Sequence, residues 1–280
     1  MSISPDTSLF RTVAGKTVIV TGAAHGIGLE TIRQYHAHGA NVVIADLPSA
    51  RKAAEDAIDD LGDASRALFV PVDIVVWDEV RTLFAAAIKR FGRVDILVAN
   101  AGIMESRGFF DFEVNAEGYL EDGGSGRVVD VNLKGTMNSA SVSKNAIFTC
   151  TDTDEALRHA VFHMKDNPPD ADGWRGSVVL VSSTSGYFGG TEVVSYVSSK
   201  HGVLGLLRSS HRSAQQLGVR VNSVAPFVTP TFITDAYLAA WKADGLPTNS
   251  PVDVAVGILH MSLDKNMRGK CFLVGRPIPT

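Results

Sequence analysis

The sequence predicts an α/β fold, a doubly wound parallel sheet of about seven strands in a single domain spanning residues 1–280. Short apolar runs alternate with longer helix-like segments, which is the pattern of strand–helix–strand units. The runs are rich in Val, Ile and Leu, as strands buried on both faces of a sheet should be. They cover residues 16–21, 41–45, 67–71, 95–99, 177–182, 219–224 and 271–274. Helix-ending glycines are expected at Gly39, Gly62, Gly92 and Gly218, each just before a strand.

Composition and charge exclude several classes of protein. The chain is 45% hydrophobic and 20% charged, as ordinary globular proteins are, and its net charge of -4 comes without a basic cluster, so no nucleic-acid partner is expected. Cys150 and Cys271 are too few for a disulfide framework and lack zinc-type spacing, which favours a reducing, cytoplasmic location and no metal. No secretory signal or membrane-spanning run is recognisable, so no membrane association is expected.

One stretch departs from the regular pattern, because more residues separate Asn132 from Ser177 than one crossover helix with short loops requires. Residues 139–154, SASVSKNAIFTCTDTD, have no helical apolar period, and we interpret them as a surface insertion. A retained intron is the open alternative. Residues 155–165 return to a helical pattern, and residues 167–173, NPPDADG, predict a turn.

A glycine-rich loop follows the first strand directly and leads into a helix. In TGAAHGIG, residues 21–28, Gly22 permits a tight turn, while Gly26 and Gly28 allow close approach of a pyrophosphate to the backbone. The helix N-terminus would offer free N–H groups to the phosphates, with His25 and Ile27 beside them. The spacing G-x-x-x-G-x-G differs from the usual G-x-G-x-x-G of Rossmann-type sites, and a glycine turn without a ligand is the alternative.

Asp46 ends the second strand, 18 positions after Gly28, near the offset expected for a carboxylate that binds a ribose diol. Its negative charge would repel a 2′-phosphate, so NAD is favoured over NADP, although Arg51 lies nearby. A turn-forming or capping Asp is the alternative. Further cofactor contacts are expected at residues that follow strands: Leu47, Asp73, Ile74, Asn100, Ala101 and Gly102.

Tyr196 and Lys200 are spaced to share one face of a helix. A lysine cation should lower the pKa of a nearby tyrosine, ordinarily about 10, and so make an acid/base pair. Upstream, Ser182 and Ser183 follow a strand and could polarise a substrate oxygen. A half-buried aromatic beside a solvated lysine is the ordinary interpretation of such a pair.

The motifs TGAAHGIG, NAG at 100–102, VNLKG around Asn132, SS at 182–183 and YVSSK at 196–200 occur in an order that resembles the classical short-chain dehydrogenase/reductase (SDR) family. The resemblance runs from about residue 16 to residue 274. It implies that Ser183, or less favourably Ser182, is the catalytic serine and that Tyr196 is the proton donor and acceptor. It also implies that Lys200 holds the nicotinamide ribose and that Asn132 carries a proton-relay water. Pro226 and either Thr229 or Thr231 would contact the nicotinamide.

Two departures from the family pattern stand out. Phe227 follows Pro226 where the family usually has Pro-Gly, a feature similar to some plant members that act on lignan or terpenoid alcohols. The 139–154 segment falls in the helix that commonly contributes to the family's dimer interface. A homodimer or homotetramer is still expected, while the relay role of Asn132 is in question.

A candidate lid, residues 227–247, carries several apolar side chains, and two aromatic residues follow the serines. Those residues are Phe232, Tyr237, Leu238 and Trp241 in the lid, and Tyr187 and Phe188 after the serines. Because ligand pockets are mostly apolar, we expect an NAD-dependent enzyme acting on a bulky hydrophobic secondary alcohol, terpenoid- or steroid-like, or its ketone. Core or subunit packing of these aromatics, an NADPH-dependent ketone reductase and a non-catalytic nicotinamide-binding sensor are the alternatives.

Overall fold

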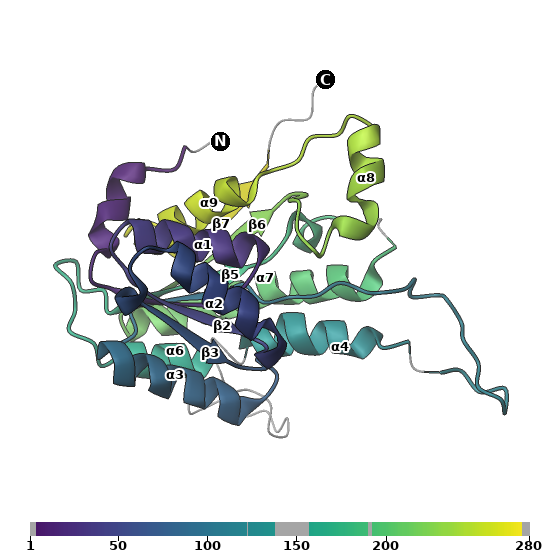
Figure 1. Ribbon diagram of the computed structural model, residues 1–280, viewed down its shortest axis with the longest axis horizontal. Coiled ribbons are helices and arrows are strands. Elements are labelled where there is room, and N and C mark those ends of the chain that lie inside the picture. The colour runs from purple at the N-terminus through teal and green to yellow at the C-terminus, as the bar shows by residue number, and fades with distance from the viewer. Residues whose placement is uncertain (1–3, 122, 138–156, 190–191, 276–280) are drawn as a thin grey trace.

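The computed structural model describes residues 4–121, 123–137, 157–189 and 192–275 (Figure 1). Within them, seven parallel strands form one sheet in the order β3-β2-β1-β4-β5-β6-β7, which confirms the predicted fold class. Each predicted strand is present, shifted by no more than two residues at either end. The strands are β1 (Thr17–Thr21), β2 (Asn41–Asp46), β3 (Ala67–Pro71), β4 (Ile96–Ala99), β5 (Gly176–Val181), β6 (Val219–Pro226) and β7 (Cys271–Val274).

Strand β1 lies inside the sheet, next to β4, where the strand order reverses. Val18 pairs with Val42 of β2 on one side and with Ile96 of β4 on the other, and every residue of β1 is buried. A strand covered on both faces is mostly apolar, which is why residues 18–20 of β1 are Val, Ile and Val, with a threonine at each end. Ligands of doubly wound sheets bind at such a reversal, outside the carboxyl ends of the strands.

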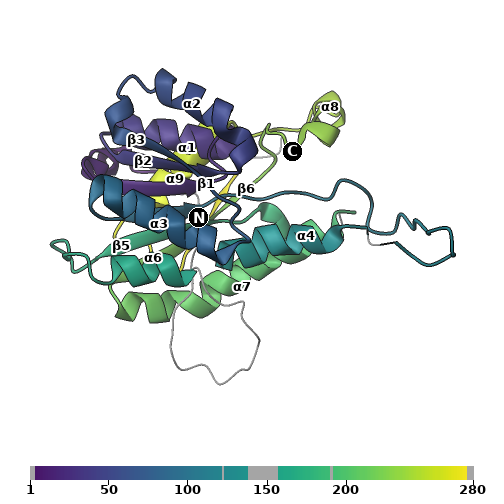
Figure 2. The same ribbon diagram turned by 60° about the horizontal axis from the view of Figure 1, so that its bottom comes forward.

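Helices cover both faces of the sheet (Figures 1 and 2). One face packs α1 (Gly26–Ala37), α2 (Arg51–Asp60) and α9 (Pro251–Leu263) into an apolar cluster; the other packs α3 (Trp77–Phe91), α6 (Leu157–Met164) and α7 (Val194–Gln216). Shorter elements are α4 (Ser125–Val129), a π-helix (Asp130–Gly135), α8 (Asp235–Ala243) and 3₁₀ turns at Thr7–Val13, Pro48–Ala50, Ala64–Arg66 and Thr184–Gly186. All four predicted helix-ending glycines have positive φ, and Gly92 caps α3 by donating its N–H to the Ile88 carbonyl at 2.7 Å.

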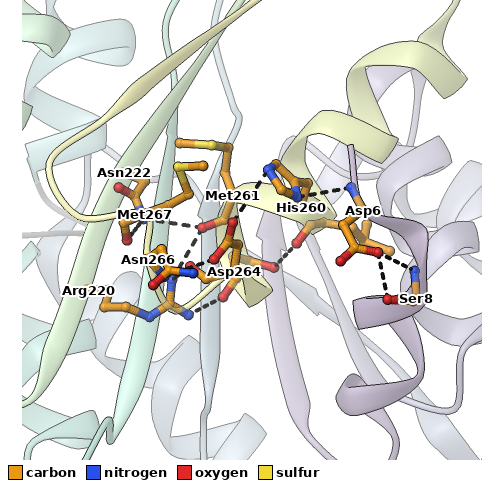
Figure 3. A network of polar contacts seen from close by, with 11 residues as sticks. Asp6, Ser8, Arg220, Asn222, His260, Met261, Asp264, Asn266 and Met267 are labelled. Carbon is orange, nitrogen blue, oxygen red and sulfur yellow. Dashed lines mark hydrogen bonds and ion pairs between the residues drawn. The ribbon is translucent and has the colours of Figure 1, made fainter. Parts of the chain in front are cut away.

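A buried polar network ties the end of α9 to β6 and to the N-terminal segment (Figure 3). The Arg220 guanidinium donates to the carbonyls of Met261 and Asp264, at 3.4 and 2.9 Å, and also to that of Ser262. These carbonyls belong to the last turn of α9 and its cap, where backbone acceptors lack helical partners. On the other side of α9, His260 Nδ1 accepts the backbone N–H of Asp6 at 3.3 Å.

Residues 104–121, together with 123 and 124, form an arm that leaves the end of β4 and projects from the body before α4 begins (Figures 1 and 2). An isolated bridge between Val114 and Leu120 is its strand-like pairing. Large apolar side chains are exposed along it: Phe109, Phe110, Phe112, Val114, Tyr119 and Leu120. This projection was not predicted from the sequence.

The expected insertion, residues 139–154, lies outside the described residues. The helical pattern after it is confirmed by α6, and the predicted turn contains a hydrogen bond from the Gly173 N–H to the Asp170 carbonyl at 2.9 Å. The candidate lid contains α8.

Candidate active site

A cavity of about 580 Å³ opens at the carboxyl ends of the strands. Its walls come from the glycine loop after β1, the ends of β2, β4, β5 and β6, the start of α7 and the candidate lid. Of the predicted site residues, those lining it are Gly22, His25, Gly26, Ile27, Asp46, Asn100, Ala101, Gly102, Ser182, Ser183, Tyr196, Lys200, Pro226, Thr229 and Thr231. Both Thr229 and Thr231 reach the wall, so the alternative between them stays open.

The glycine loop is shaped by close backbone approach. Gly22 has a φ of +63°, and a Cβ there would lie 2.7 Å from the Cα of Ala101, so the conformation and the space both require glycine. A Cβ on Gly28 would overlap the carbonyl oxygen of Gly22. The N-cap of α1, His25, makes no side-chain hydrogen bond to the helix. The loop therefore offers an uncapped helix N-terminus at the cavity, which suits a phosphate group.

Asp46 holds the glycine loop as well as lining the cavity. Its Oδ2 accepts the N–H of Ala24 at 2.9 Å, and its Oδ1 accepts that of Leu47 at 2.8 Å. These contacts give Asp46 a structural role in the loop, and each carboxylate oxygen retains acceptor capacity for a ribose hydroxyl. Arg51 instead pairs with Glu55 at 3.4 Å and lies over the ring of Phe69.

Four of the predicted cofactor-binding residues do not line the cavity: Gly28, Leu47, Asp73 and Ile74. Gly28 lies behind the loop, where it permits close packing. The Asp73 carboxylate turns back to accept the Val75 N–H at 3.0 Å. Ile74 packs against Gly135, and the Leu47 side chain is exposed.

Tyr196, Lys200 and Ser183 converge in the cavity, and all three side chains are buried. Tyr196 and Lys200 share a face of α7, with the Lys200 Nζ 5.5 Å from the centre of the Tyr196 ring. The Tyr196 hydroxyl is hydrogen-bonded to Ser183, at the end of β5. Ser182 donates its hydroxyl to the Lys200 carbonyl at 3.1 Å, so the geometry favours Ser183 over Ser182 as the serine that faces a substrate.

Burial controls the pKa values of both titratable groups. It raises the pKa of Tyr196 to about 12, although the Ser183 hydrogen bond acts in the opposite direction. It lowers the pKa of Lys200 to about 8, and Lys200 Nζ donates to the Val181 carbonyl at 3.0 Å. The pKa of Tyr196 therefore lies above its ordinary value of about 10, because desolvation outweighs the Ser183 hydrogen bond.

Asn132 lies next to the cavity but does not line it. Its side chain is fully buried: Nδ2 donates to the Ile103 carbonyl at 2.8 Å and to Ser199 Oγ at 3.0 Å, while Oδ1 accepts the Ile103 N–H at 2.8 Å. Asn132 therefore joins the start of the arm to α7. It lies in the π-helix, and such irregular turns occur often at functional sites.

Aromatic side chains form the outer part of the cavity. Those lining it are Phe188, Phe227, Phe232, Tyr237 and Trp241, whereas Leu238 and Tyr187 do not line it. Phe227 and Trp241 meet edge to face, with ring centroids 5.6 Å apart. The base of the lid is held by Asn249, whose Nδ2 donates to the Val274 carbonyl at 2.9 Å and whose N–H donates to the Val228 carbonyl at 2.8 Å.

Sequence reasoning missed Met104 and Val193 in the cavity wall, and Glu105 and Ser199 behind it. Glu105 contacts backbone amides that are distant in sequence, and no local pattern signals such a contact. The partners of Ser199 and Asn132 are equally invisible without the fold.

Comparison with known proteins decides the family. The family model described as short chain dehydrogenase matches residues 16–241. The chain belongs to the short-chain dehydrogenase/reductase family. Membership makes it an oxidoreductase of alcohol and ketone groups that binds a nicotinamide cofactor.

Individual SDR relatives are moderately similar. Short-chain dehydrogenase reductase 5 of Arabidopsis thaliana is 34% identical over 79% of this chain and 73% of its own length. 3-Hydroxyacyl-CoA dehydrogenase type-2 of Homo sapiens is 32% identical over 79% of this chain and 76% of its own. The solved structure of 3-ketoacyl-(acyl-carrier-protein) reductase from Brucella melitensis, complexed with NADH, has a TM-score of 0.75 at 25% identity and covers 94% of this chain and 97% of its own.

Among the described residues, no three His, Cys, Asp or Glu side chains are arranged to hold a metal ion. No helix in the same part of the chain has both the length and the apolar character needed to cross a membrane.

Proposed function

We propose that the protein is an NAD-dependent dehydrogenase that interconverts a bulky hydrophobic secondary alcohol, terpenoid- or steroid-like, and its ketone. The observation that carries this proposal is the buried Tyr196 hydroxyl, hydrogen-bonded to Ser183 and accompanied by the Lys200 ammonium in a cavity that also contains the glycine loop. An acid/base group, a hydrogen-bond donor for a substrate oxygen and a cofactor site are the parts that hydride transfer requires.

In the oxidative direction, Ser183 holds the substrate oxygen, and the Tyr196 phenolate takes its proton. When bound, the oxidised cofactor supplies a hydride acceptor and a positive charge in the cavity. Lys200 stays cationic at neutral pH, since its pKa is about 8, and it opposes the burial that disfavours the phenolate. In the reductive direction, Tyr196 returns the proton to the substrate oxygen.

NAD is proposed over NADP because the Asp46 carboxylate lies in the cavity wall, where a 2′-phosphate would meet like charge. The nearby cation, Arg51, is engaged by Glu55 and Phe69. A structural neighbour at 25% identity was solved with NADH, which is consistent with this choice.

The proposed substrate class rests on the aromatic part of the cavity. Phe227, Trp241 and their neighbours place apolar surface around the opening above Ser183 and Tyr196, and a hydrophobic alcohol gains affinity by covering it. Relatives act on varied substrates, so the cavity wall is the better guide.

The test is a screen of NAD reduction with the purified protein over hydrophobic secondary alcohols, including steroids and terpenoids, beside short polar alcohols. We expect turnover to be confined to the bulky apolar alcohols and to be lost in Tyr196→Phe. Titrations with both dinucleotides accompany the screen. Tight NADP binding with NAD affinity at millimolar Kd or weaker would reverse the cofactor assignment, and undiminished turnover by Tyr196→Phe would refute the mechanism.

A cytoplasmic homodimer or homotetramer is part of the same proposal. Exposed apolar side chains, Phe162 on α6 and those of the arm, supply surface that a second copy would cover. Light scattering on the purified protein decides between a monomer and these assemblies.

A further inference from the structure

Glu105, at the root of the arm, reaches the first turn of α7. Its Oε1 accepts the backbone N–H of Tyr196 at 3.1 Å and also that of Ser195. One carboxylate oxygen thus joins the segment that follows β4 to the helix that carries Tyr196.

This contact replaces a cap that α7 does not have in its own sequence. The N-cap residue is Val193, which has no side-chain acceptor, and no side-chain hydrogen bond caps the helix there. The first N–H groups of a helix have no intrahelical partners, and leaving them unsatisfied is destabilising. A negative charge at this end of a helix is also favoured by the helix dipole.

The second carboxylate oxygen of Glu105 distinguishes it from an ordinary cap. Oε2 is buried and has no hydrogen-bond partner among the described residues. Glu105 does not line the cavity, although its neighbour Met104 does. The carboxylate is therefore placed against the helix rather than toward a substrate.

We propose that Glu105 is a positioning residue for Tyr196: it fixes the first turn of α7 and thereby the direction of the Tyr196 hydroxyl toward Ser183. The role of Tyr196 as acid/base belongs to the proposed function, on which this inference rests. Small displacements of a reacting group are costly to rate, and a mispositioning of about 1 Å can cost 10²-fold.

Glu105 also sets the charge around the phenol. The groups that face Tyr196 are Ser183 at the end of β5, Tyr237 of α8, Lys200 of α7 and Glu105. Glu105 is the carboxylate of this set, and with Tyr237 it raises the pKa of Tyr196 beyond the effect of burial. Removing its charge should move the ionisation of Tyr196 to lower pH.

The experiment compares Glu105→Gln and Glu105→Ala with Glu113→Gln. Glutamine keeps an acceptor oxygen without the charge, and alanine removes both. Glu113→Gln is the control, because Glu113 is a carboxylate of the arm that pairs with Arg107. Two measurements are made: amide hydrogen exchange over residues 193–200 in the cofactor-free protein, and the pH profile of kcat/KM for an alcohol found in the screen.

We expect faster exchange of the Ser195 and Tyr196 amides in Glu105→Ala, with kcat about 10-fold lower or more and the Kd for NAD unchanged. Glu105→Gln should retain most of the wild-type kcat. The midpoint of the acidic limb in its pH profile of kcat/KM should fall by about 0.5 pH unit. Glu113→Gln should match the wild type in both measurements.

Unchanged amide exchange in Glu105→Ala would overturn the contact between Glu105 and α7. Faster exchange with unaltered kcat and pH midpoint would show that Glu105 is only a structural cap and would overturn the positioning role. An unshifted midpoint in Glu105→Gln would overturn its electrostatic part. If the wild type oxidises no alcohol, the proposed function fails, whereas the exchange measurement still decides whether Glu105 holds the helix.

Discussion

The ring of His25, in the glycine loop, meets the ring of Phe232, in the lid, edge to face with centroids 5.1 Å apart. Beside this pair, a Cβ on Gly26 would lie 3.1 Å from Cγ2 of Thr231. The lid therefore rests on the loop expected to hold the cofactor phosphates, and the cofactor and substrate regions of the cavity share a wall.

Removing this contact should weaken cofactor binding. An edge-to-face aromatic pair contributes about 0.5–1.5 kcal/mol, so we expect Phe232→Ala to raise the Kd for NAD by roughly 2- to 10-fold in a calorimetric titration. Phe110→Ala removes an equally exposed phenylalanine from the arm and serves as the control. An unchanged Kd in Phe232→Ala would mean that the lid does not support the loop.

Tyr196→Phe keeps the buried ring and deletes the hydroxyl that Ser183 contacts. Because acid/base catalysis typically contributes 10²- to 10⁴-fold, kcat should fall by about that factor while the Kd for NAD stays within about 3-fold. Steady-state kinetics and a binding titration measure the two effects. Tyr187→Phe, which alters a tyrosine outside the cavity wall, should retain full activity.

Asp46→Asn removes the charge at the end of β2 and one of the two acceptors that hold the Ala24 and Leu47 amides. Hydrogen bonds to charged groups contribute about 1.5–3 kcal/mol, so NAD affinity should fall roughly 10-fold or more. The affinity for NADP should fall by less than this, or should rise. The ratio of the two Kd values is the measurement. Asp56→Asn, in an exposed pair with Lys52 on α2, should leave the ratio unaltered.

Arg220→Ala should destabilise the fold without changing a residue of the active site. Burial lowers the pKa of Arg220 to about 10, and its guanidinium satisfies carbonyls at the end of α9 (Figure 3). Leaving those acceptors unpaired should reduce the free energy of unfolding by about 3 kcal/mol in urea titrations. Arg208→Ala, on the exposed side of α7, should change it by less than about 0.5 kcal/mol.

Stability should fall as the pH drops from 6.5 to 4. Burial lowers the pKa of His159 from 6.5 to about 4, and its ring stacks on Trp77 with centroids 3.9 Å apart. Between those pH values His159 is protonated in the unfolded chain but not in the folded chain. The stability present above pH 6.5 is therefore lost on acidification, and the free energy of unfolding should be lower by about 1–2 kcal/mol at pH 5.

His159→Phe keeps a stacking ring and removes the titration, so it should flatten this part of the unfolding profile. The pKa of His163 is lowered for the same reason, burial first, and some slope will remain. A profile as steep in His159→Phe as in the wild type would exclude His159 as the main source.

The strands and most of the cavity wall were predictable because their signals are local. Buried parallel strands are mostly apolar, and parallel strands deliver the residues that follow them to one edge of the sheet, as with Asn100 and Ser183. The turn taken by a loop after a strand is less constrained, which is why Asp73 and Leu47, predicted as cofactor contacts, lie outside the cavity wall.

Properties that depend on surroundings could not be predicted. A lysine four residues from a tyrosine suggests a lowered phenol pKa, but the extent of burial, which reverses that direction at Tyr196, is set by β5, α8 and the arm. The arm itself has no strong periodicity, and Glu105 within it resembles any loop carboxylate until its hydrogen-bond partners are known.

Asn249, just after the end of the lid, is hydrogen-bonded to Val228 at the start of the lid and to Val274 of β7, which pairs with Pro226. The intervening segment is accordingly a closed loop anchored outside the sheet. Its aromatic residues other than Phe232, which contacts His25, can be exchanged together while β6 and β7 stay as they are. Selection for new substrates can thus act on this loop while folding stability, which depends on the sheet and the helices packed on it, stays nearly constant.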